Sequence, residues 1–197
     1  MNNRTENHLT ANQLSGRATG AIFFACFGSL WLGLSLYVRQ LLNPATGISL
    51  ALALLSLLLT SIWLLGEAKS WPSLPEDRTK NRAFHRINLL QWIVVAIVGF
   101  AFSRLHLDTY VITAITAIVG LHMFPLARLF RYPMHYVTGA ALTGWAAISC
   151  LFVPTEHLQG ITAMGTGILL WLSAACTLVL AIGLTRKPAL ARRTSHV

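Results

Sequence analysis

The sequence has few charged residues and very few acidic ones. Only 11% of its 197 residues are charged, and Asp and Glu together number 6, whereas a soluble domain of this size has about 25% charged residues. Hydrophobic residues make up 55% of the chain. A deficit of charge this large means that much of the apolar surface faces something other than water.

The sequence also lacks a cysteine framework and the short motifs of common catalytic sites. Its three cysteines, Cys26, Cys150 and Cys176, lie inside apolar segments, which predicts free thiols that pack as small hydrophobic groups. No nucleophile motif, phosphate-binding loop, zinc-binding helix or dinucleotide fingerprint occurs. The sequence therefore assigns no catalytic residue and implies no cofactor, and an enzyme is the less favoured class.

What the sequence does contain is a series of six long apolar runs. They cover residues 20–38, 48–66, 87–103, 109–126, 134–152 and 161–184. An α-helix needs about 20 residues to cross the hydrocarbon core, and a helix satisfies its own backbone hydrogen bonds in lipid. We therefore expect an all-α integral membrane protein, with a single six-helix transmembrane domain (20–184) between a polar tail (1–19) and a basic tail (185–197).

The basic residues are unevenly distributed between the ends of these runs. Thirteen of the 15 Lys and Arg residues lie in the two tails and in the second and fourth loops, and the other two are Arg39 and Arg104. Cytoplasmic loops carry the excess of Lys and Arg in membrane proteins. Both termini are therefore predicted to be cytoplasmic, and the net charge of +9 is explained without a nucleic-acid partner.

Polar side chains gather near the cytoplasmic ends of the third, fourth and fifth runs. Asn88, Gln91 and Trp92 are spaced i, i+3 and i+4, which predicts a shared helix face. His122 lies just inside the end of the fourth run, and His135 begins the fifth. The two amides and the two histidines are thus expected at similar depth, where they form a candidate polar pocket. The candidate contacts with lipid headgroups or another anion are Arg86, Arg128 and Arg131.

Several explanations of this polar group stay open. Amides in membrane spans commonly hydrogen-bond between helices, for about 0.6 kcal/mol each, and interfacial basic residues often anchor headgroups. Intramembrane ionisable groups are also candidates for function. Ligation of haem or a metal by His122 and His135 is an alternative, but the pair lacks a one-helix ligand spacing, so no metal is assigned. A second alternative is an outer-side metal site of His106, Asp108, Glu156 and His157.

Three functional hypotheses follow. The favoured one is a small-solute carrier or channel with a polar vestibule at the cytoplasmic end; no Asp, Glu, Lys or Arg lies in the middle of a run, which counts against a proton-coupled carrier. The alternative is a structural or assembly partner of a membrane complex, or a homo-oligomer. It is suggested by small-residue pairs that let helices approach closely, namely Thr116/Gly120, Ala140/Gly144 and Ala163/Gly167. The third is a membrane-embedded haem protein or enzyme.

The fourth run contains the motif G-L-H-M-F-P-L-A at residues 120–127, and Y-V-T-G follows at residues 136–139. Together they resemble a segment of small bacterial multi-span membrane proteins of unknown function. The resemblance covers a small part of the chain. It implies a location in the bacterial inner membrane, and it transfers neither a substrate nor a catalytic role.

Overall fold

The computed structural model describes residues 10–72 and 78–194, and within them the chain is almost entirely helical. The elements are α1 (Ala11–Val38), α2 (Pro44–Ala68), α3 (Arg78–Arg104), the short 3-10 helix η1 (Asp108–Tyr110), α4 (Val111–Phe130), α5 (Met134–Phe152) and α6 (Thr155–Thr194). No strand occurs in these residues. The prediction of an all-α fold with six long helices is confirmed.

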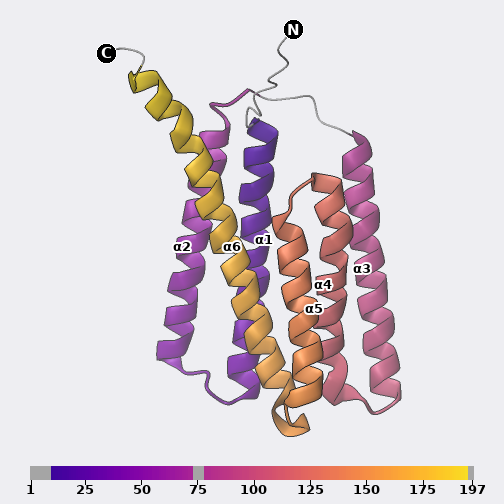
Figure 1. The fold of residues 1–197 in the computed structure, drawn as a ribbon. Coiled ribbons are helices and arrows are strands. Elements are labelled where there is room, and N and C mark those ends of the chain that lie inside the picture. The colour runs from indigo at the N-terminus through magenta and orange to yellow at the C-terminus, as the bar shows by residue number, and fades with distance from the viewer. Residues whose placement is uncertain (1–9, 73–77, 195–197) are drawn as a thin grey trace.

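The helices lie side by side in a single bundle (Figure 1). The most extensive contact joins α1 to α6, the first and last helices, and the next joins α4 to α5. α6 also touches α4 and α5, so it links the two pairs. α2 packs mainly on α1 and α3 mainly on α4, which leaves α2 and α3 as opposite edges of the bundle (Figure 1).

Glycine permits the close approach within both central pairs. A Cβ atom added to Gly28 of α1 would lie 3.0 Å from the carbonyl oxygen of Gly167 of α6. One added to Gly139 of α5 would lie 2.8 Å from the carbonyl oxygen of Gly120 of α4. Any larger residue would force these backbones apart, so the glycines set the spacing of the bundle.

The predicted small-residue pairs meet this requirement unequally. The pair Thr116/Gly120 and the pair Ala163/Gly167 are buried between helices. Ala140, in contrast, is exposed, and nothing lies within 4 Å of a Cβ added to Gly144. That pair is therefore not used for packing inside the chain.

The helices extend into the segments predicted as tails. α1 begins at Ala11, because Thr10 caps it: the Thr10 hydroxyl accepts from the N–H of Gln13 at 3.3 Å, and the Gln13 side chain accepts from the N–H of Thr10 at 3.4 Å. This reciprocal capping box supports a helix start in a polar stretch. α6 likewise continues to Thr194. The remaining parts of the predicted tails, 1–9 and 195–197, lie outside the described residues.

α4 also continues past its predicted end at residue 126. Pro125 lies inside the helix, which ends only at Arg131, a residue with a left-handed φ of 50°. Because proline has no N–H, the carbonyl of Leu121 lacks its usual donor within the helix. The following corner between α4 and α5 lies at the same end of the bundle as the start of α1 and the end of α6 (Figure 1).

Five of the helices are long and apolar enough to cross a membrane, and they are α1, α2, α3, η1 with α4, and α6 up to Thr185. α5 is not among them, since its 19 residues include His, Thr, Ser and Gly. Only 11% of the span in α2 and 0% of the span in α3 is buried, so both helices present apolar side chains outward. These are the features of an integral membrane protein.

Candidate polar site at the corner between α4 and α5

The candidate site is centred on a hydrogen bond between α3 and α4. Nε2 of His122 lies 3.0 Å from Oδ1 of Asn88. With the amide oxygen as acceptor, Nε2 of the neutral imidazole carries the proton and Nδ1 is left as an acceptor. α3 contacts few elements other than α4, so this bond helps to set the position of α3 along α4.

His135, at the start of α5, is surrounded by aromatic rings. The ring centroids of Phe24, Phe130 and Tyr132 lie 5.9, 6.4 and 5.1 Å from that of His135, all in edge-to-face orientation. The guanidinium of Arg17 lies 5.1 Å from the centroid of the Tyr132 ring, a cation–π contact. Groups from α1, α4 and the corner therefore hold the imidazole of His135 in place.

Each histidine keeps one buried nitrogen without a hydrogen-bond partner. Nδ1 of His122 and Nδ1 of His135 are unmatched within the part of the chain that the structure describes. Most buried polar atoms are hydrogen-bonded, so each exception calls for an explanation. Together with the carbonyl of Leu121, these nitrogens offer unused hydrogen-bonding capacity at one depth.

The structure brings two of the four predicted pocket residues, Asn88 and His122, into contact. His135 lies at the start of α5 among the three aromatic rings described above. Gln91 lies on the same half-buried side of α3 as Asn88, one turn farther from the corner. The prediction that Trp92 shares this face is wrong, since its side chain is 57% exposed on the outer side of α3. α3 packs through a narrow stripe, and a residue one position beyond Gln91 is turned by about 100° around the helix.

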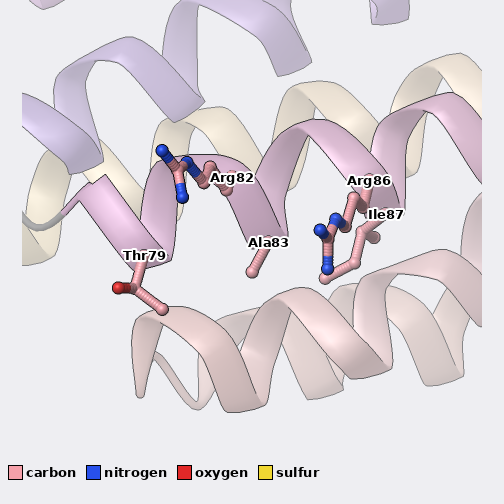
Figure 2. A pocket seen from close by; sticks show the side chains of 5 residues that line it. All are labelled: Thr79, Arg82, Ala83, Arg86 and Ile87. Carbon is pink, nitrogen blue, oxygen red and sulfur yellow. The ribbon is translucent and has the colours of Figure 1, made fainter.

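The three arginines predicted to meet an anion are all exposed. Arg86 lines an open groove of about 430 Å³ along the start of α3, shown in Figure 2. The other residues lining this groove are Thr79, Arg82, Ala83 and Ile87. Arg128 and Arg131, at the end of α4, are not part of its lining.

A row of hydroxyl groups along α6, which the sequence analysis did not identify, continues from the site into the bundle. It consists of Thr162, Thr166, Ser173 and Thr177. The first two lie 3.3 and 2.9 Å from the hydroxyls of Thr113 and Thr116 of α4. The hydroxyl of Ser173 lies 2.9 Å from that of Thr138 of α5, and Thr177 accepts from Tyr132 at 3.4 Å. The spacing of 4, 7 and 4 residues along an apolar helix is the sequence signal of this row.

Two further hydroxyls on α5 are buried and lack a partner within the described residues. They are Oγ1 of Thr143 and Oγ of Ser149. Three of the four unmatched buried side-chain atoms thus belong to α5, and the fourth belongs to His122 on α4. Unused hydrogen-bonding capacity is concentrated on this pair of helices.

The two histidines do not belong to a cluster of metal-ligating side chains within the described residues. No group of three or more His, Cys, Asp or Glu residues gathers in residues 10–72 or 78–194, whereas protein zinc sites use three or four such ligands. This also removes the predicted outer-side cluster of His106, Asp108, Glu156 and His157. Nε2 of His122 is bonded to Asn88, and three aromatic rings contact the ring of His135.

Comparison of the chain with models of protein families, with curated proteins and with solved structures finds no match. The site is therefore interpreted from its own geometry: a neutral, hydrogen-bonding centre at the level of the corner, with basic side chains around it.

Proposed function

We propose that the protein spans a bacterial inner membrane six times, with both termini in the cytoplasm. The support is the uneven distribution of Lys and Arg, together with the position of the start of α1 and the end of α6 at one end of the bundle (Figure 1). In this topology α5 crosses the membrane between α4 and α6, which both contact it and reduce its exposure to lipid.

This topology has a direct test. Alkaline phosphatase, which is active only outside the cytoplasm, is fused after Val197 and, in a second fusion, after Pro154 in the turn between α5 and α6. The fusion at Val197 is expected to be inactive and the fusion at Pro154 active. Activity at Val197 would overturn the proposed orientation.

We further propose that the protein binds and conducts a small neutral solute through a vestibule at its cytoplasmic end. The observation that carries this proposal is the hydrogen bond between Asn88 and His122, together with a buried and unmatched nitrogen on the imidazoles of His122 and His135. The hydroxyl row on α6 supports it, because hydroxyls both donate and accept hydrogen bonds. A neutral solute is favoured since no charged side chain lies deep in a span.

The vestibule is tested by accessibility to a membrane-impermeant maleimide. Asn88→Cys and His135→Cys are made in a background in which Cys26, Cys150 and Cys176 are Ala. Both new thiols are expected to react in inverted membrane vesicles and to be protected in right-side-out vesicles. Leu55→Cys on the exposed face of α2 is the matched control and should react in neither. Absence of reaction at residue 88 from the cytoplasmic side would contradict a vestibule.

Conduction is tested with glycerol and urea as probe solutes. Proteoliposomes containing the protein should reswell faster than empty liposomes after an osmotic step, as followed by light scattering. Asn88→Leu should slow this by about tenfold, since loss of a buried hydrogen-bond partner costs about 1–3 kcal/mol. Trp92→Leu, on the outer face of the same helix, should leave the rate unchanged. Reswelling equal to that of empty liposomes for both probes would overturn the proposed conduction.

An assembly role is the second candidate, and the surface of Ala140 and Gly144 favours it. This pair has the spacing of a close helix contact but faces outward. Gly144→Leu would block such a contact and shift a complex to the monomer in size-exclusion chromatography. A monomer already in the unaltered protein, without a co-purifying protein, would count against this role.

A further inference from the structure

The groove along the start of α3 combines two guanidinium groups with an apolar floor. Arg82 and Arg86 are four residues apart, so they lie one helical turn from each other on the same flank. Ala83 and Ile87 supply the apolar floor, and Thr79 lies at its outer end. Figure 2 shows Thr79, Ala83 and Ile87 projecting toward the helix that runs alongside α3.

The groove lies where the polar and apolar parts of α3 meet. The apolar run of this helix begins at Ile87, directly after Arg86. No residue of α3 is fully buried, and α3 packs mainly on α4, so its flank is open to the surrounding lipid. An occupant of the groove can therefore enter sideways from the bilayer, with a polar part near the arginines and an apolar part along Ile87 and the residues below it.

The charge of the groove selects an anion. Both guanidinium groups are exposed, and neither forms an ion pair within residues 10–72 and 78–194. Arginine binds phosphate oxygens through two parallel N–H groups. Basic pockets beside membrane helices on the cytoplasmic side are suited to anionic lipid headgroups.

From these observations we infer that the groove formed by Thr79, Arg82, Ala83, Arg86 and Ile87 is a binding site for one anionic phospholipid. Its phosphate contacts Arg82 and Arg86, and its acyl chains follow the apolar flank of α3. A free phosphate ion shares the headgroup chemistry but does not use the apolar floor. This site is separate from the proposed vestibule, since Asn88, His122 and His135 are not among the residues that line the groove.

The test is native mass spectrometry of the full-length protein, purified in detergent with added phosphatidylglycerol or phosphatidylcholine. One phosphatidylglycerol is expected to stay bound at low lipid concentration, and phosphatidylcholine is not. Arg82→Gln/Arg86→Gln should weaken this binding by about 30-fold, because each basic residue near an anionic lipid contributes roughly a factor of five. Added inorganic phosphate should not displace the lipid; displacement by phosphate alone would assign the groove to a free anion and overturn the inference.

Two variants separate a site from a general effect of charge. Arg128→Gln/Arg131→Gln removes the same charge at the same end of the bundle and should keep the bound lipid. An equal loss in both double variants would overturn the inference. Ala83→Phe fills the floor while both guanidinium groups remain, and it should weaken binding without lowering the melting temperature; full retention of the lipid in this variant would also contradict the site.

Discussion

α2 and α5 are both helices of one bundle, but they satisfy their polar groups in opposite ways. In α2 the hydroxyls of Ser49, Ser56, Thr60 and Ser61 each donate to a carbonyl of the same helix, at 2.7 to 2.8 Å. In α5 only Thr138 does so, while His135, Thr143 and Ser149 each keep an unmatched buried atom within the described residues. These hydroxyls of α2 need no hydrogen-bond partner on a neighbouring helix, whereas α5 has buried polar atoms that could still form a hydrogen bond.

This difference accompanies a difference in position: α2 lies at the edge of the bundle, whereas α5 packs against both α4 and α6. An edge helix such as α2, with a mean hydropathy of 2.4, can place a hydroxyl in lipid only when its own backbone accepts the proton. A helix held between neighbours can keep polar atoms that the backbone does not satisfy, at a cost in stability. Proteins accept such a cost mainly at functional sites, so the unmatched atoms of α5 and of His122 on α4 are consistent with the proposed site around Asn88 and His122.

The largest contrast between the two helices is expected for a single added methyl group. Gly139→Ala on α5 brings a Cβ within 2.8 Å of the carbonyl oxygen of Gly120 and 2.9 Å of Cβ of Met123. Overpacking of this kind costs about 1–3 kcal/mol. Gly66→Ala on α2 meets nothing within 4 Å and should gain up to about 1 kcal/mol in helix propensity. Thermal unfolding in detergent measures both, and an equal effect of the two changes would remove the contrast.

An intermediate effect, with opposite signs, is expected for two serines that are each 0% exposed. Ser61 on α2 donates to the carbonyl of Leu57, so Ser61→Ala should cost about 0.5 kcal/mol. Ser149 on α5 has no partner within the described residues, so Ser149→Ala should stabilise the protein by about 1 kcal/mol. The measurement is the free energy of unfolding in mixed micelles. A loss of stability at Ser149 would show that its hydroxyl is satisfied after all.

The smallest effect is expected for a hydrogen bond between helices. A double-mutant cycle of Thr138→Val and Ser173→Ala isolates the contact between α5 and α6, and we expect a coupling of about 0.6 kcal/mol. The corresponding cycle of Ser56→Ala on α2 with Ser173→Ala should show no coupling, because Ser56 bonds only within α2. A coupling at Ser56 as large as that at Thr138 would mean that the measured coupling does not report a direct contact between Ser173 and α5.

The sequence predicted the long helices well, because each is bounded by a strong change from apolar to polar composition. Their ends were less predictable. α1 starts at Ala11 through a capping box, and α4 passes through Pro125, and neither event changes the hydropathy of the run. Local hydrogen bonds decide such boundaries, and they are weak signals beside a span of apolar residues.

The depth of the candidate site was readable from the order of the helices, but its lateral arrangement was not. Asn88 and His122 were expected at one level, and their contact at 3.0 Å depends on how α3 is rotated against α4. The same rotation turns Trp92 outward. A periodic pattern does not fix this angle over residues 93–102 of α3, because all of them are apolar or Gly and no polar face identifies the outside.

The pairing of α1 with α6 bears on how the bundle is made. The Ser35 hydroxyl bonds to the carbonyl of Gly160, 125 residues later in the chain, and Gly28 meets Gly167. Chains are synthesised from the N-terminus, so α1 enters the bilayer long before its main partner exists. The contacts that Gly28 and Ser35 make with α6 can therefore form only after the five helices between α1 and α6 have been synthesised, and the pairing of α1 with α6 completes the bundle within the described residues.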